Sequence, residues 1–286
     1  MRLENMRAYL TIFILSVFVQ MDIAGQGLHF FADVMRNAEV ADHRKIGATE
    51  FDRLFIEELQ RDGFDRSFDE LHQWVSFLYD PDSTFRVITW QVDCSDTMAY
   101  RGLIQKNSGE VVSLVDKSGE LEDIEYDILG PEDWHGALYY DIVSLNASTH
   151  ILLGYNGLYG DQARKIAEVL DLEDDLQFGK EIFVFKDDEV RPTVKTRILL
   201  DYSKLGAVRL TYDRDEKLLF FDNLIAVDSY EKQGEVVLVQ DGSFNGYYLK
   251  GDKLYYKEKL FTTSVDEPPR ERPKTTSDKD LFGNPK

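Results

Sequence analysis

Residues 137–172 read ALYYDIVSLNASTHILLGYNGLYGDQARKIAEVLDL, and this stretch has the strongest pattern in the chain. Two apolar runs within it, residues 139–145 and 151–155, are rich in β-branched and aromatic side chains. Asn146 and Ser148 separate the runs, and both residue types favour turns. The stretch therefore predicts a β-hairpin, which is typical of antiparallel sheets.

The hairpin is followed by glycines and then by a helical pattern. Asp161 is a candidate N-cap, and the apolar residues after it recur at the i, i+3, i+4, i+7 spacing of a helix: Ala163, Ile166, Ala167 and Leu170. We therefore expect one helix over residues 162–172 that covers one face or one end of the sheet. The glycine spacing fits neither a dinucleotide-binding loop nor a P-loop, so it predicts a sharp turn with close strand-to-helix packing and no cofactor.

The first 25 residues have the layout of a secretory signal peptide. Arg2 and Arg7 precede an apolar run over residues 8–19, and Ala24 and Gly25 provide a small-residue exit. The run is shorter than the roughly 20 residues that a membrane-spanning helix needs. We therefore expect cleavage near Gly25, no membrane span afterwards, and a periplasmic or secreted protein. An uncleaved N-terminal anchor is the alternative.

Composition restricts the classes of partner. The formal net charge is −20 and there is one cysteine, Cys94, so an intramolecular disulfide is excluded. A negative field repels phosphate backbones and anionic membrane surfaces, so we expect no nucleic-acid partner. If the chain has a partner, we expect a basic or a glycan partner.

The N-terminal part, residues 26–79, has a helical pattern. After the candidate N-cap Thr49, four apolar residues share one helix face: Phe51, Leu54, Phe55 and Leu59. Gly63 separates this helix from a second one, which we expect after Ser67 with an apolar face of Phe68, Leu71, Trp74, Val75 and Leu78. At the opposite end, residues 262–286 hold four of the seven prolines among mixed charges, which predicts a disordered tail.

Residues 80–261 are predicted to form a β-rich domain. Besides the hairpin, short apolar and aromatic runs occur at residues 84–92, 99–106, 111–115, 181–185, 194–201, 208–212, 217–222, 235–239, 246–250 and 254–257. Ser108-Gly109 and Gly251-Asp252 are suited to tight turns between such runs. The fold class that we expect is α+β: a β-rich antiparallel meander, closed as a sandwich or barrel, with N-terminal helices and one covering helix.

Candidate catalytic residues occur close to the hairpin. Glu132, Asp133, His135 and Asp141 combine acids with neighbouring aromatic residues, as glycoside hydrolases do. Adjacent strand residues point to opposite faces, however, so Glu132 and Asp133 are not expected to face each other across a substrate. We therefore favour a non-catalytic binding or structural module of the cell envelope, with a hydrolase acting on a glycan or peptide as the alternative.

Metal sites are not predicted. Acidic turns at residues 171–175, 187–189 and 213–216 offer oxygen ligands for calcium, but none matches the spacing of an EF-hand loop. The five histidines are dispersed and lack the spacing of a zinc site. Solvated turn charge is the preferred interpretation of these acids.

A series of short motifs runs through the chain in order: PDSTFRVITWQ at 81–91, YRGLIQ at 100–105, WHGALYY at 134–140, LLGYNG at 152–157, RILLDYS at 197–203, LTYD at 210–213, FDNL at 221–224 and DGSFNG at 241–246. In these motifs the chain resembles a family of uncharacterised exported proteins of Gram-negative bacteria. The resemblance covers about residues 67–261. It implies an exported single-domain protein with no assigned role and no catalytic residues to transfer. Residues 26–66 have no counterpart in it.

Overall fold

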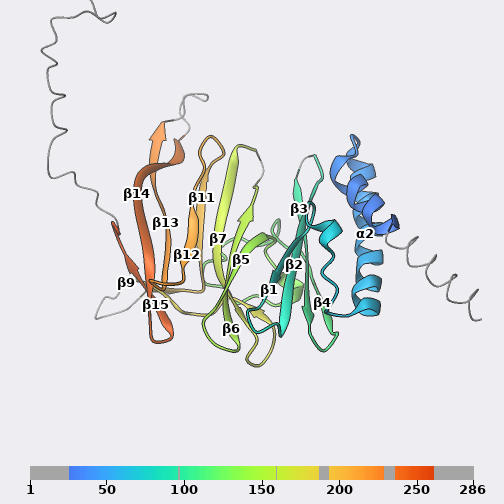
Figure 1. Cartoon of the computed structure of the whole chain (residues 1–286). Helices are drawn as coiled ribbons and strands as arrows, with labels where there is room; N and C mark the ends of the chain where they lie inside the picture. The colour runs from blue at the N-terminus through green and yellow to red at the C-terminus, as the bar shows by residue number, and fades with distance from the viewer. Residues whose placement is uncertain (1–25, 96, 159, 187–192, 229–235, 261–286) are drawn as a thin grey trace, which may run out of the picture.

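A computed structural model describes residues 26–95, 97–158, 160–186, 193–228 and 236–260 (Figure 1). The predicted cleavage site at Gly25 and the predicted tail lie outside these residues. The fold is α+β, as predicted, with helices at the N-terminal end followed by mainly antiparallel sheets. No helix within the described ranges has the length and apolar character needed to cross a membrane.

Helix α2 (Ala41–Asp62) follows a shorter helical segment over residues 26–37. Phe51, Phe55 and Leu59 are completely buried, so the apolar face predicted for this helix is confirmed. Gly63 ends α2 with a φ of 75°, a conformation that favours glycine.

Two details of the helical region differ from the prediction. The helix begins at Ala41, and Thr49 lies inside it, donating its hydroxyl proton to the carbonyl of Lys45. The second predicted helix is also wrong, because only the 3-10 turn η1 (Asp69–Leu71) is helical and strand β1 (Ser76–Tyr79) follows it. Strand β1 pairs with the next strand, and this tertiary contact overrides the local helical spacing.

The first sheet is a meander of four antiparallel strands in the order β1–β2–β3–β4. The strands after β1 are β2 (Phe85–Asp93), β3 (Met98–Lys106) and β4 (Val111–Leu114). The predicted turn between β3 and β4 is confirmed, since Gly109 has a φ of 93° there.

The second sheet has the order β11–β7–β6–β5, with β8 beside β7. Its strands are β5 (Leu138–Ser144), β6 (Thr149–Asn156), β7 (Gln162–Asp171), β8 (Gln177–Phe178) and β11 (Arg197–Ser203). The predicted hairpin is confirmed as β5 and β6. Its turn is held by Asn146, whose Oδ1 accepts hydrogen bonds from the backbone nitrogens of Ser148 and Thr149, both at 2.9 Å.

The predicted covering helix over residues 162–172 is wrong, because β7 occupies this stretch. Ala163 and Ala167 belong to the core shared with the third sheet, whereas Ile166 and Leu170 belong to the core shared with the first sheet. Both faces of the strand are therefore buried, and apolar residues from the two faces together imitate the spacing of one helical face. In a run this short, the spacing of apolar residues alone does not distinguish a strand that is buried on both faces from an amphipathic helix.

Of the two purposes predicted for the glycines in and after β6, the sharp turn is confirmed, whereas the close packing is against a ring of the same sheet and not against a helix. Gly160 has a φ of 72°, as a sharp turn requires. Gly154 packs against the ring of Tyr139, where an added Cβ would lie 2.8 Å from Cδ1. The turn leads into a strand, however, and not into a helix.

The third sheet has six strands in the order β10–β9–β15–β14–β13–β12. They are β9 (Phe183–Lys186), β10 (Thr193–Lys195), β12 (Leu210–Asp213), β13 (Leu218–Asp228), β14 (Val236–Lys250) and β15 (Lys253–Lys257). Strand β14 is one long strand where the sequence predicts two. The pair formed by β15 and β9 is parallel, so the sheet departs from a purely antiparallel meander.

The helices and sheets stack as four layers, and the described sheets stay open and do not close into a barrel (Figure 1). One core lies between the helices and the first sheet and includes Phe51 and Trp90. A second core, between the first and second sheets, includes Val87 and Tyr139. The third core lies between the second and third sheets and includes Leu219. The two inner sheets are therefore buried on both faces.

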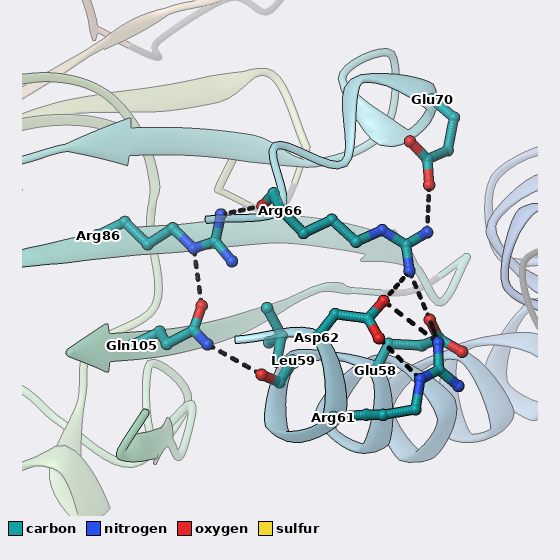
Figure 2. A network of polar contacts seen from close by, with 8 residues as sticks. All are labelled: Glu58, Leu59, Arg61, Asp62, Arg66, Glu70, Arg86 and Gln105. Atoms are coloured by element: carbon teal, nitrogen blue, oxygen red, sulfur yellow. Dashed lines mark hydrogen bonds and ion pairs between the residues drawn. The ribbon is translucent and has the colours of Figure 1, made fainter. Parts of the chain in front are cut away.

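A buried arginine ties α2 to the first sheet (Figure 2). Arg86 Nε donates to Gln105 Oε1 at 2.8 Å, and Nη1 donates to the carbonyl of Arg66 at 2.6 Å. Gln105 Nε2 in turn donates to the carbonyl of Leu59 at 3.1 Å. Since Leu59 lies in the last turn of α2, these bonds connect the end of the helix to β2 and β3.

An ion-pair network surrounds the same junction (Figure 2). Arg66 contacts Glu58 at 2.6 Å and Glu70 at 2.7 Å, and it also contacts Asp62. The Glu58 side chain is almost fully buried, so its charge needs these partners. The network fixes the loop between α2 and η1.

Candidate functional site

The outer face of the third sheet carries a row of side chains from four adjacent strands. Residues directly opposite each other in an antiparallel pair point to the same face. Asp213 of β12 lies opposite Leu218 of β13. Leu218 lies opposite Tyr248 of β14, which lies opposite Tyr255 of β15. Leu219 is completely buried in the core against the second sheet. Successive residues of a strand point to opposite faces, so the neighbouring Leu218 and the rest of the row face outward.

A groove of about 810 Å³ includes three members of this row, Asp213, Leu218 and Tyr248, whereas on β15 it is lined by Tyr256 and Lys257 and not by Tyr255. Its lining consists of Asp213, Glu216, Leu218, Tyr248, Tyr256, Lys257 and Leu260. Leu218 lies between Asp213 and Tyr248 in the strand register, so an apolar side chain separates an acidic one from an aromatic one; we call these the floor, the acidic wall and the aromatic wall of the groove. An apolar floor with a few charged groups at its sides is typical of ligand-binding pockets, which range from roughly 300 to 1,000 Å³.

Both walls of the groove are supported by contacts within the protein. Tyr248 is 40% exposed, and its ring stacks on Tyr255 with centroids 5.8 Å apart and planes at 27°. On the other wall, Asp213 Oδ1 accepts hydrogen bonds from the backbone nitrogens of Asp215 and Glu216, both at 3.0 Å. The groove is therefore formed without a ligand.

A second cleft, of about 520 Å³, lies at the end of the second and third sheets. Its lining is Leu145, Asn146, Ser148, Thr149, Glu173, Lys180, Ile182, Leu249, Gly251 and Asp252. Lys180 already pairs with Asp171 at 2.8 Å and with Glu173 at 3.2 Å, and the hydrogen bond to Asp171 raises its pKa. This cation is satisfied by the protein itself, so the cleft is a weaker candidate than the groove.

The predicted candidate His135 belongs to a buried polar cluster between the first and second sheets. His135 Nε2 lies 2.8 Å from Glu168 Oε1, and the hydroxyl of Tyr139 donates to the same oxygen. Arg197, opposite Glu168 in the strand register, donates from Nε to Glu168 Oε2 at 3.2 Å. Both oxygens of this fully buried carboxylate therefore have partners, as a buried charge requires.

Two side chains in this cluster, Glu168 and Tyr139, have pKa values far from neutral pH. Burial by itself raises the pKa of Glu168, but His135 and Arg197 together lower it to about 2. Burial also raises the pKa of Tyr139 well above its ordinary value, and the neighbouring Glu168 adds to the effect. A general acid or base works best with a pKa near the operating pH. The cluster is therefore suited to holding the two sheets together and poorly suited to proton transfer.

A cavity of about 30 Å³ adjoins His135 and reaches Asn156 and Arg164. A water molecule occupies roughly 10–15 Å³ on this measure, so the cavity has room for one or two waters. It is too small for a sugar ring or a peptide side chain.

The other predicted catalytic residues lie outside this cluster. Glu132 and Asp133 are exposed on the 3-10 turn η2 (Pro131–Asp133). Asp141 is half-buried on β5 and pairs with Arg214 at 2.6 Å. Of the four predicted residues, His135 is the one that reaches the interior.

A serine, a histidine and an aspartate come together in a second buried cluster that the sequence does not indicate. Ser144 Oγ lies 2.9 Å from His150 Nδ1 and 3.0 Å from Asp80 Oδ1. In hydrolytic triads the histidine stands between the other two groups, whereas here the serine does. Burial lowers the pKa of His150, while Asp80 opposes this effect. The arrangement gives His150 Nδ1 and Asp80 Oδ1 a partner but leaves His150 Nε2 buried without one among the described residues. Since 64 residues separate Asp80 from Ser144, no local motif reveals the cluster.

Metal-ligating side chains do not converge in the described part of the chain, where no group of three or more His, Cys, Asp or Glu residues could hold an ion. The acidic turn at residues 187–189 lies outside the described ranges. Cys94 is a free, half-buried thiol.

Comparison with known proteins gives no relative: the sequence matches no protein-family model and no curated protein. The resemblance to exported proteins of Gram-negative bacteria therefore stays a prediction.

Proposed function

We propose that this protein is a non-catalytic, exported binding module of the cell envelope, periplasmic or secreted, and that its ligand occupies the groove on the outer face of the third sheet. The observation that carries this proposal is the groove itself, with a volume of about 810 Å³ and Leu218 in its lining. Its walls combine the exposed ring of Tyr248 with the charged groups of Asp213, Glu216 and Lys257. Apolar surface provides affinity in such pockets, and a few polar groups fix orientation.

A binding role is favoured over catalysis by the state of the predicted catalytic residues. His135 is held by Glu168, and Asp141 is held by Arg214. Glu132 and Asp133 are exposed and follow one another on a short turn. A hydrolase needs an acid and a base on opposite sides of one scissile bond, within one cavity.

The experiment follows ligand binding and product formation together. The mature protein is applied to an array that carries oligosaccharides and basic peptides, and each bound ligand is recovered and analysed by mass spectrometry. We expect retention of an intact ligand, lost in the Tyr248→Ala variant. Tyr126→Ala is the matched control, because Tyr126 is 49% exposed and does not line the groove. Shortened products that disappear in Asp213→Asn or Glu216→Gln would instead support the hydrolase.

Export is tested separately. The basic start and the short apolar run of residues 8–19 support cleavage near Gly25. Mass spectrometry of the protein from the cell envelope and the medium is expected to show a new N-terminus at Gln26. A protein that retains Met1 would contradict export by cleavage.

A further inference from the structure

The aromatic wall of the groove has the surface that a sugar ring packs against. Tyr248 belongs to β14, which lies in the outermost sheet of the stack (Figure 1), and its ring stacks on Tyr255. Tyr255 does not line the groove, so it supports Tyr248 from the side away from the ligand. The face of an aromatic ring carries partial negative charge, and the C–H groups of a pyranose ring carry partial positive charge, so the two attract each other.

The remaining groups of the groove match a ligand that both donates and accepts hydrogen bonds. Asp213 and Glu216 accept hydrogen bonds, whereas the ammonium group of Lys257 donates them. Sugar hydroxyls do both, so they can use either kind of group. An apolar ligand would bury the two carboxylates without partners, which is costly.

Local charge favours a neutral ligand. The net charge of −20 attracts basic partners at long range. Within the lining of the groove, however, Asp213 and Glu216 face one cation, Lys257, so the local formal charge is only −1. Charges separated by more than about 8 Å are largely screened at physiological salt, so a ligand in the groove meets this small local charge and not the net charge of the chain.

We infer that the groove binds a neutral oligosaccharide, with one sugar ring packed on Tyr248 above Leu218 and with hydroxyls bonded to Asp213, Glu216 and Lys257. This inference rests on the proposed function as a binding module. It assigns the class of ligand that the groove takes.

The inference is tested by calorimetric titration of the mature protein with defined probes. The probes are the neutral hexasaccharides cellohexaose, maltohexaose, laminarihexaose and chitohexaose, together with an octalysine peptide. We expect at least one hexasaccharide to bind, and Tyr248→Ala to weaken that binding by about tenfold or more. Tyr248→Phe keeps the ring and is expected to stay within about threefold of the parent. Tyr126→Ala is expected to bind as the parent does, and thermal melts establish that each variant is folded.

The possible results separate the two proposals. If octalysine binds in a Tyr248-dependent manner and no hexasaccharide does, the glycan assignment is wrong and the binding module stands. If no probe shows Tyr248-dependent binding, both proposals are wrong. Salt gives an independent readout, because sugar binding is expected to be insensitive to ionic strength whereas octalysine binding would weaken steeply.

Discussion

Tyrosines and carboxylates occur together in two regions of this molecule with opposite consequences. Between the first and second sheets, Tyr139 and Glu168 are completely buried and bond to each other. On the outer face of the third sheet, Tyr248 and Asp213 stand on either side of Leu218, and the ring is 40% exposed. A buried carboxylate must be paired within the protein, whereas a solvated one stays available for a ligand. Tyrosine and carboxylate side chains therefore indicate a binding or catalytic site only where the fold leaves them accessible.

The largest effect is expected from breaking the buried cluster. Arg197→Ala should lower the free energy of unfolding by about 3–5 kcal/mol, because Glu168 loses its paired cation inside the protein. The carbonyl of Ile124 loses the Arg197 donor as well, and the carbonyl of Phe178 keeps the bond from the Leu129 backbone nitrogen. Urea unfolding followed by tryptophan fluorescence measures the change. Arg214→Ala is the control, because that side chain is 58% exposed and its pair with Asp141 is expected to contribute about 1 kcal/mol or less. Equal losses of unfolding free energy in the two variants would contradict the difference expected between a buried and an exposed ion pair.

Lowering the pH is expected to destabilise the same cluster, with a slightly smaller loss of unfolding free energy than Arg197→Ala. The pKa of Glu168 is about 2 in the folded protein and 4.5 for an ordinary glutamate. The unfolded chain therefore binds this proton at a higher pH than the folded protein does. The contribution of ionised Glu168 to the free energy of unfolding is complete above about pH 4.5. It is lost as the pH falls toward 2, and the loss amounts to about 3 kcal/mol.

Urea midpoints measured between neutral pH and pH 3 test this dependence. Glu168→Gln removes the titrating group, so its midpoint should fall less steeply with acid than that of the parent. Parallel curves for the two proteins would show that other groups dominate acid unfolding.

A moderate effect is expected from crowding the ring of Tyr139. In Gly154→Ala the new methyl group would lie 2.8 Å from Tyr139 Cδ1, so the ring or the strand must shift, at a cost of about 1–3 kcal/mol. Gly119→Ala is the matched control, because nothing lies within 4 Å of its added Cβ, and it should change stability by about 0.5 kcal/mol or less. Thermal melts of both variants give the comparison. An unchanged melt for Gly154→Ala would show that this part of the second sheet is loosely packed.

The smallest effect on stability is expected at the groove. Tyr248→Ala should lower the free energy of unfolding by about 1 kcal/mol, since its ring is partly exposed and loses mainly the stacking contact with Tyr255. Ligand binding, in contrast, should be lost. A melting temperature lowered by many degrees would mean that Tyr248 serves mainly to stabilise the third sheet.

Local features of the fold could be predicted from the sequence. The hairpin of β5 and β6 follows from β-branched runs on either side of Asn146, and the turn is closed by bonds within four residues. The buried face of α2 follows from the spacing of Phe51, Phe55 and Leu59. These features depend on neighbours in the chain, which a sequence pattern contains.

The errors arose where distant partners decide the conformation. β7 resembles a helix in its apolar spacing because both of its faces are covered by other sheets. The pairing of β1 with β2 likewise replaces the helix expected after Ser67. Whether a strand face is buried depends on the layers that pack on it, and the local spacing of apolar residues does not reveal these layers.

The candidate site shows the same division. Residue type and near neighbours were enough to predict the α+β class, most of the strand-forming segments, the tight turns and the acidic charge, but not the strands β1 and β7. Only the tertiary structure decided that His135 is held by Glu168, a residue 33 positions away, and that Asp213, Leu218 and Tyr248 form one groove. The register between strands selects which side chains meet, and that register follows from the packing of the whole stack.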